Sequence, residues 1–364
     1  MSLRSGQLLA ATAASMAYCD APPLGAANES ASDHMEEMRA LQYYTYGVAM
    51  PVICALGIVG NLLNLLVLTR KNMKSVAYCY MRGYATSSLV ALLLAVPFCL
   101  RILLHGETRS WSQYGVAVYF ARLELYLGNG FIGLSVLMLV ALTTERYISV
   151  CHPVRAHNQT NEGRRARLTL ALLPVCTFII FSPYTLRNSV TACLASDNST
   201  TYRIAENLAF TQSVYYLVYK WTLKILYKIA PTVAVTYLNL QIYWSYRRVC
   251  RKRRALVQLS REQRAQQTDE HRLMMLLGST ATLFFFCNLP MVILSVSFTQ
   301  AMIRSYSFQV FRAVSNVLEI VNYSLTFYIY CLFTKEFRDT FFKTIGLREH
   351  SSVLPPSKSS KTDV

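Results

Sequence analysis

Charged side chains are scarce in this sequence of 364 residues. Asp, Glu, Lys and Arg make up 15% of the chain, whereas a soluble globular domain has roughly 25%. Hydrophobic residues make up 53%, and they gather in long uncharged runs instead of spreading over several small cores. The composition therefore excludes a soluble enzyme and, apart from the two ends, a disordered chain.

Sequence signatures of catalysis and cofactor binding are also missing. The chain has no internal repeat, no glycine-rich phosphate loop, no metal-ligand cluster of Cys and His and no paired carboxylates. Most of its ten cysteines lie inside the apolar runs, where cysteine behaves as a small hydrophobic residue. We therefore expect neither an enzyme nor a bound metal or cofactor.

Five uncharged runs each approach or exceed the roughly 20 residues that cross a bilayer. They are Ala40–Thr69, Gly83–Leu100, Leu125–Thr144, Leu168–Leu186 and Leu273–Ile303. Two further apolar segments carry charges: 207–246 contains three lysines, and 313–334 contains Glu319. We predict an all-α membrane protein with seven transmembrane helices.

The basic residues indicate how the chain crosses the membrane. The net charge is +17, but Lys and Arg form short clusters between apolar runs instead of one basic face, which argues against nucleic-acid binding. Residues 1–40 have a net charge of −3, and residues 247–272 have a net charge of +6. Because basic loops stay in the cytoplasm, we expect a multi-pass plasma-membrane protein with an extracellular N-terminus and a cytoplasmic C-terminus.

This orientation divides the chain into four parts. Residues 1–40 form an extracellular segment, 41–334 the seven-helix domain, 335–346 an amphipathic helix on the cytoplasmic membrane surface and 347–364 a disordered tail. The sequons at Asn28 and Asn198 then lie outside the cell, where glycosylation occurs.

Local motifs at fixed places on these helices narrow the class. They are Gly60-Asn61 in the first helix, Glu145-Arg146-Tyr147 at the end of the third, Pro231 in the fifth, Cys287-Asn288-Leu289-Pro290 in the sixth and Phe337-Arg338 after the seventh. This pattern resembles the rhodopsin-like (class A) G-protein-coupled receptors over nearly the whole chain, up to Phe342. Through Glu145–Pro153 and Cys287–Pro290 it most resembles the invertebrate FMRFamide-receptor branch of neuropeptide receptors.

The resemblance implies a receptor for an amidated, FMRFamide-like neuropeptide that signals to heterotrimeric G proteins and to arrestin by conformational change. Two alternatives remain: an orphan receptor with high basal activity and, less favoured, a transporter of small solutes. Lysines and a glutamate within the membrane would suit a transporter, but repeated halves and discontinuous helices are not visible in the sequence.

The resemblance also implies a switch at the cytoplasmic membrane edge. An ion pair between Glu145 and Arg146 would hold the bundle closed, and its loss would free the guanidinium for a partner. The residues to which we assign the switch are Glu145, Arg146, Tyr147, Pro231, Pro290 and Tyr330. The two prolines break helical hydrogen bonds and so create kinks about which helix halves can pivot.

Several positions depart from the family pattern. Ser88 stands where relatives have the sodium-binding Asp, and Asn288 stands where they have the indole of the sixth helix. Ala121 replaces the third-helix cysteine, so Cys193 of the second outer loop lacks its usual partner. Cys19 is the preferred substitute and Cys99 a weaker one, while an unpaired Cys193 is about as plausible.

Lysines 220, 224 and 228 recur every four residues and therefore form one stripe on the fifth helix. For Lys220 we favour extension of the ammonium to the outer membrane surface, whereas Lys224 and Lys228 lie deeper. Because charges at this depth are costly, Glu319 and Glu124 are natural counter-charges, although either acid could instead bind an arginine of a peptide. For Glu319 both interpretations stay open, and for Glu124 we favour a place at the pocket rim. The expected ligand-binding set is Glu124, Tyr126, Tyr216, Trp221, Lys224, Asn288 and Glu319.

The cytoplasmic side offers two further contacts. The basic run 247–254 is expected to contact anionic lipid, at about 1 kcal/mol per basic residue near the surface. The chain ends in Thr362-Asp363-Val364, which resembles a ligand for a PDZ-domain protein, because such domains capture a free carboxylate by adding a strand.

Replacement of the acid by Ser88 predicts that sodium does not stabilise the inactive state specifically. Without a buried anion, nothing compensates for dehydration of the cation. Agonist affinity should therefore be equal in sodium, potassium and choline at the same ionic strength. A sodium-specific fall in affinity that disappears on substitution of Ser88 or Ser135 would show that the site persists without the acid.

Overall fold

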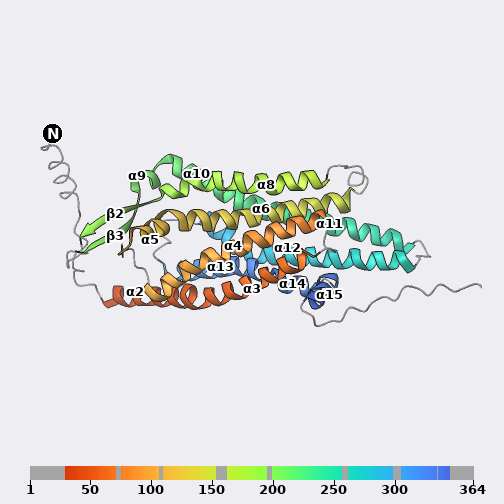
Figure 1. The fold of residues 1–364 in the computed structure, drawn as a ribbon, viewed down its shortest axis with the longest axis horizontal. Helices are drawn as coiled ribbons and strands as arrows, with labels where there is room; N and C mark the ends of the chain where they lie inside the picture. The colour runs from red at the N-terminus through yellow and green to blue at the C-terminus, as the bar shows by residue number, and fades with distance from the viewer. Residues whose placement is uncertain are drawn as a thin grey trace, which may run out of the picture.

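The computed structural model is a bundle of long helices, with a small sheet at one end and a short helix near the other (Figure 1). The structure describes residues 29–70, 75–105, 110–152, 162–194, 199–255, 261–297, 305–333 and 335–344. Below, "hairpin end" denotes the end of the bundle that carries strands β2 and β3, and "α15 end" denotes the opposite end.

The first half of the chain supplies four rods. The first rod runs from α2 (Glu29–Gln42) through the π-helical η1 (Tyr43–Ala49) into α3 (Met50–Leu68), and the second is α4 (Val76–His105). The third rod runs from α5 (Tyr114–Val118) through the π-helical η2 (Tyr119–Leu123) into α6 (Glu124–Cys151). The fourth rod is α8 (Glu162–Phe181), which ends in the 3₁₀ turn η3 (Ser182–Leu186). The first rod begins well inside the segment 1–40 that was expected to precede it.

The second half supplies three more rods. They are α10 (Val214–Lys224) continuing through η4 (Ile225–Ile229) into α11 (Ala230–Ala255); α12 (Arg261–Ser297); and α13 (Tyr306–Ser324) followed by α14 (Thr326–Phe333). Helix α15 (Lys335–Thr344) comes next, and α11 and α12 extend beyond the other helices at the α15 end (Figure 1).

A three-stranded sheet covers part of the hairpin end, which the sequence did not lead us to expect. Strands β2 (Asn188–Leu194) and β3 (Thr200–Glu206) pair antiparallel, and β1 (Ser110–Trp111) pairs with the other edge of β3. The short helix α9 (Leu208–Thr211) then leads into α10. The side chain of Ser213 caps α10 by accepting a hydrogen bond from the amide of Tyr216 at 3.2 Å.

Five helical spans of the described residues are long and apolar enough to cross a membrane: Met35–Leu68, Val76–His105, Tyr114–Cys151, Gly163–Leu186 and Gly278–Ser297. Each contains most or all of one of the five uncharged runs of the sequence, except that the last run extends past Ser297 into residues that the structure does not describe. The two charged segments are also helical, as α10–α11 and α13–α14. The all-α membrane fold with seven long helices is confirmed, with the small sheet as an addition.

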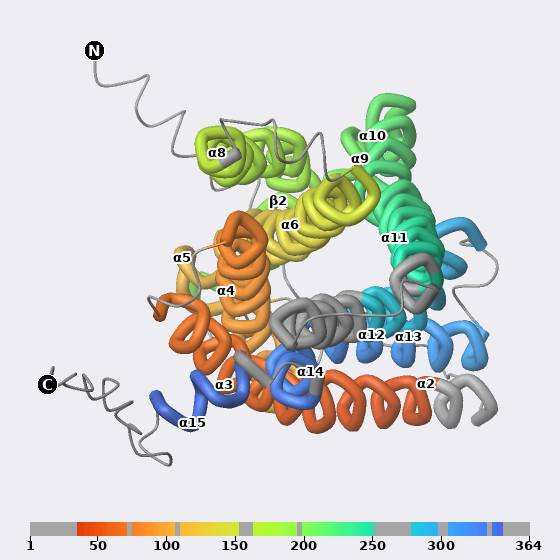
Figure 2. Tube along the Cα trace, turned by 90° about the vertical axis from the view of Figure 1, so that its right-hand side faces the viewer, coloured from red at the N-terminus to blue at the C-terminus, as the bar shows by residue number. Residues whose placement is uncertain are grey.

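The third rod lies at the centre of the bundle. Helix α6 contacts α4, α8 and α11, and Figure 2 shows it between α4 and α11, with α8 on the periphery. The largest buried cluster joins α6 to the α15 end, and within it Phe337 of α15 packs against Phe327 and Tyr330 of α14. The expected amphipathic helix therefore lies against the end of the bundle through its apolar face.

Glycine allows close contact between the first and seventh rods. The Nδ2 atom of Asn61 donates to the carbonyl of Gly57 at 2.8 Å and to that of Tyr323 on α13 at 2.9 Å. A Cβ atom at Gly57 would meet the Ser324 hydroxyl, and it would lie 2.8 Å from the Cβ of Ser324 and 2.7 Å from a methyl group of Leu92. The hydrogen bond to Tyr323 thus depends on a residue without a side chain at position 57.

Gly57→Ala should lower the thermal stability of the detergent-solubilised protein, because overpacking in a tight core costs about 1–3 kcal/mol. Gly128→Ala on α6 is the matched control, since nothing lies within 4 Å of a Cβ atom added there. Unfolding temperatures measured on both variants test this prediction. Equal values for Gly57→Ala and the wild type would contradict it.

Candidate functional site

A cavity of about 130 Å³ lies between α6, the end of α8 and the α10–η4 segment. Its walls include Asn129 and Gly133 of α6, Phe181 at the end of α8, and all three lysines of the predicted stripe. Lysines 220, 224 and 228 are each half-buried. The stripe therefore faces the bundle interior, as its cost in lipid requires.

The innermost lysine forms an ion pair with the seventh rod. The ammonium of Lys228 donates to Oε1 of Glu319, and the Glu319 side chain is only 9% exposed. Of the two interpretations that the sequence left open for Glu319, this geometry favours the structural pair. The pair links η4 to α13 across the bundle, and in this structure it occupies the carboxylate that was expected to bind a ligand.

The other two lysines have neutral partners. The ammonium of Lys224 donates to the carbonyl of Ser295 on α12 at 2.5 Å and lies 4.6 Å from the ring centroid of Trp221. The ammonium of Lys220 lies 5.2 Å from the ring centroid of Tyr216. Because aromatic rings and carbonyls stabilise a cation without cancelling its charge, the cavity wall stays positive.

The second expected acid does not contact the lysines. Glu124 at the start of α6 lies 3.6 Å from the guanidinium of Arg101 on α4. That guanidinium also lies 5.4 Å from the ring of Phe98 and 5.1 Å from the ring of Phe120. The idea of Glu124 as a counter-charge to the fifth helix is wrong in this structure, because a nearer cation on α4 takes the carboxylate.

The expected aromatic and amide residues do not line the cavity. Tyr126 packs edge to face on Phe178 of α8, with ring centroids 5.7 Å apart. Tyr216 is buried in the same aromatic cluster, whereas Trp221 is 42% exposed on the outer face of α10. Asn288 is buried and donates to the carbonyl of Phe284 one turn earlier in α12. Of the seven expected binding residues, only Lys224 lines the cavity wall.

Hydroxyl groups join α4 and α6 where the family resemblance places a carboxylate. The Ser88 hydroxyl donates to that of Ser135 at 3.3 Å, and the Ser135 hydroxyl lies 3.0 Å from that of Ser87. Nearby on other helices, the buried Nδ2 atoms of Asn64 and Asn322 have no hydrogen-bond partner among the described residues. The position of Ser88 thus forms a neutral link between helices.

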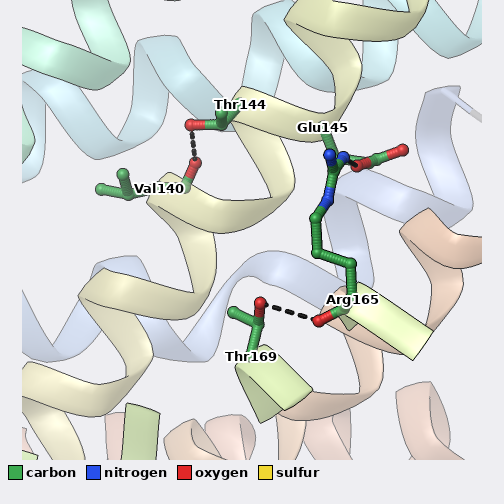
Figure 3. A network of polar contacts seen from close by, with 5 residues as sticks. All are labelled: Val140, Thr144, Glu145, Arg165 and Thr169. Atoms are coloured by element: carbon green, nitrogen blue, oxygen red, sulfur yellow. Dashed lines mark hydrogen bonds and ion pairs between the residues drawn. The ribbon is translucent and has the colours of Figure 1, made fainter. Parts of the chain in front are cut away.

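At the α15 end, the predicted ion pair between Glu145 and Arg146 is replaced by another. The Glu145 carboxylate on α6 lies 3.5 Å from the guanidinium of Arg165 on α8, and Figure 3 shows the two side chains pointing toward one another. Consecutive residues of a helix do not face each other, which explains why Glu145 turns to a neighbouring helix instead. The Nε atom of Arg146 is buried and has no hydrogen-bond partner within the described ranges.

The other expected switch residues lie at breaks or contacts between helices. Pro290 lies inside α12, where it cannot donate a helical hydrogen bond, and Pro231 follows the π-helical η4. Tyr330 is buried, and its ring lies 5.6 Å from that of Phe337. Tyr147 contacts His152 at the end of α6, with 3.4 Å between its hydroxyl and the ring Nε2.

The cysteine prediction is tested only in part. Cys193 is buried on β2, whereas Cys19 lies outside the described residues, as do the sequons at Asn28 and Asn198 and the terminal residues Thr362, Asp363 and Val364. The weaker candidate, Cys99, packs against Cys54 in the bundle interior. At the position of the missing third-helix cysteine, Asn188 of β2 donates to the carbonyl of Ala121 at 3.3 Å.

Three residues that form these contacts were not predicted from the sequence. Arg101 and Arg165 were not singled out in the sequence, yet each forms an ion pair with a carboxylate of α6. Asn188 carried no signal, because its partner is a backbone carbonyl. Arg101 could have been found, since it interrupts an apolar run on the helix next to Glu124.

Comparison with known proteins establishes the class. The sequence model of the 7 transmembrane receptor (rhodopsin family) matches residues 60–330. Two probable G-protein coupled receptors of Caenorhabditis elegans are similar to this chain. One is 32% identical over 81% of this chain and 68% of its own length. The other is 27% identical over 91% of this chain and 82% of its own length. The FMRFamide receptor of Drosophila melanogaster is 24% identical over 84% of this chain and 54% of its own length. The chain belongs to the rhodopsin family of seven-transmembrane receptors, and it is therefore a membrane receptor and not an enzyme.

Removal of one charge from the Lys228–Glu319 ion pair should destabilise the receptor. Glu319→Gln keeps the size of the side chain but leaves a buried cation unpaired, which costs about 3–5 kcal/mol. We expect reduced surface expression and a lower unfolding temperature. The double variant Lys228→Met/Glu319→Leu should recover both, because it removes the two charges together.

Glu36→Gln on the exposed face of α2 is the matched control for loss of one carboxylate. Normal expression and stability of Glu319→Gln, combined with a tenfold loss of peptide potency, would instead identify Glu319 as a contact of the ligand.

Proposed function

We propose that this receptor is activated by an extracellular amidated neuropeptide of the FMRFamide-like class. The observation that carries the proposal is the cavity between α6, α8 and the α10–η4 segment, whose wall combines aromatic and cationic side chains. Aromatic walls with a few fixed polar groups suit the hydrophobic and amide ends of a short peptide. The similarity to a receptor for FMRFamide supports the same class.

The signal passes along the fifth and sixth rods. A peptide in the cavity contacts α10, which continues through η4 and Pro231 into α11, and α11 contacts α6 through Cys151 and the carbonyl of Gln241 at 3.9 Å. The carbonyl of Ser295, which accepts from Lys224, lies on the same helix as Pro290. Ligand binding thus biases two kinked helices whose far ends project at the α15 end.

On the cytoplasmic side we propose that Arg146 contacts the heterotrimeric G protein once α11 and α12 move apart. The hairpin end is extracellular and the α15 end cytoplasmic in this scheme, as the distribution of basic residues predicts. Arrestin shares this surface. Anionic lipid contacts the basic run of α11.

High basal activity is a second proposal, and one contact favours it. In the described structure the Glu145 carboxylate contacts Arg165 and forms no ion pair with Arg146, so the direct contact expected to keep the bundle closed is replaced by one between helices. A receptor with an unrestrained switch arginine has a smaller free-energy gap between its resting and active states. Basal signalling is then raised without any ligand.

A peptide screen tests the proposed function. Membranes that contain the receptor are exposed to a library of amidated peptides, and guanine-nucleotide exchange is measured with several G proteins. We expect exchange to increase with at least one peptide and to fall to background in Arg146→Gln, while Arg39→Gln on exposed α2 retains it. Solute flux without nucleotide exchange would contradict the receptor mechanism and support a transporter.

A further inference from the structure

The charge of the cavity wall is not balanced. Three lysines line the cavity, and the one that is neutralised, Lys228, is paired with Glu319. The described cavity walls contain no Asp or Glu. Glu124, the other acid that the sequence analysis proposed as a counter-charge, forms an ion pair with Arg101. Two positive charges, on Lys220 and Lys224, therefore face the cavity without a carboxylate partner within the described residues.

The neutral partners of these two lysines hold them in place. Lys224 is fixed from one side by the Ser295 carbonyl and from another by the Trp221 ring, and Lys220 rests on Tyr216. An ammonium has three donors, and the described contacts of Lys224 use one hydrogen bond and one ring face. Both lysine side chains line the cavity, and the described contacts of the Lys224 ammonium leave donors available.

Cations of this kind are costly without an anion, because partial burial removes water that would otherwise solvate them. A carboxylate placed between them gains charge-assisted hydrogen bonds, which are roughly twice as strong as neutral ones. The nearby rings of Phe181, Tyr184 and Tyr227 provide an apolar wall for the group that carries the carboxylate. The cavity therefore fits an acidic ligand group with apolar surroundings.

We infer that the agonist of this receptor presents a carboxylate, from an acidic residue of the peptide, to Lys220 and Lys224 in the cavity between α6, α8 and α10. The inference rests on the proposed peptide function for the origin of the carboxylate. It departs from the expectation that an arginine of the peptide binds Glu319, since that acid already neutralises Lys228.

Benzoate and benzamide test the site without any peptide. The two compounds share one ring and differ in charge, and each is added to the purified receptor at equal ionic strength, in chloride buffer. At ten times its dissociation constant, benzoate should raise the unfolding temperature of the wild type by about 2–4 °C, and benzamide should not. The increase should be absent in Lys224→Gln and reduced in Lys220→Gln.

Arg203→Gln is the matched control, because Arg203 is exposed on β3 and does not line the cavity. This variant removes one positive charge from the same end of the molecule and should respond to benzoate as the wild type does. Equal stabilisation by benzoate and benzamide, or an equal loss in Arg203→Gln, would overturn the inference. If Lys224→Gln fails to fold, Lys220→Gln alone decides the outcome.

Paired peptides then identify the source of the carboxylate. Each active peptide from the screen is made with its acidic residue as Glu or as Gln, and the Glu form should be at least tenfold more potent on the wild type but equally potent on Lys224→Gln. Equal potencies on the wild type would show that the carboxylate does not come from the peptide. Benzoate binding without any active peptide would retain the anion site and refute the peptide function.

Discussion

The need to pair charges inside an apolar bundle determines how its helices are held together. The described residues contain three ion pairs that join separate rods: Arg101–Glu124 near the hairpin end, Lys228–Glu319 at mid-depth and Glu145–Arg165 near the α15 end. The charges of the first two pairs are largely buried and would be costly alone, so each of these pairs restricts the relative positions of two helices, whereas the Arg165 side chain of the third is 46% exposed. A movement that separates one pair must supply a new partner for both charges.

The central position of α6 follows from these contacts. It contributes Glu124 and Glu145 to two of the pairs, and Ser135 links it to α4 through neutral hydroxyls. The segment η2, which precedes α6 in the same rod, holds the sheet, because Asn188 of β2 donates to the carbonyl of Ala121, where family relatives are expected to have a cysteine. The hairpin is thus attached to the bundle by a hydrogen bond as well as by strand pairing with β1.

The helices could be predicted because bilayer thickness demands long apolar runs, and this signal is local in the sequence. Partners could not be predicted in the same way, because which side chain meets Glu145 depends on the rotation and packing of α8. The hairpin escaped because the strands at 188–194 and 200–206 are short and only partly alternating, although residues such as Val190, Thr201 and Ile204 favour strands. The lysine stripe was recognised by its spacing, while the assignment of Glu319 to Lys228 required the fold.

The π-helical turn η4 contains the cavity lysine that is bound to α13, whereas the two cavity lysines without a carboxylate partner among the described residues precede this turn. Lys220 and Lys224 lie on α10, before the turn, and Lys228 lies within it. A π-turn accommodates one extra residue, and each residue of an α-helix advances about 100° around the axis. Return of η4 to α-helical geometry would therefore rotate α10, with its two lysines, relative to α11 by about that angle. A change of helical register at this one turn would therefore change which side chains the two halves of the fifth rod present to the bundle.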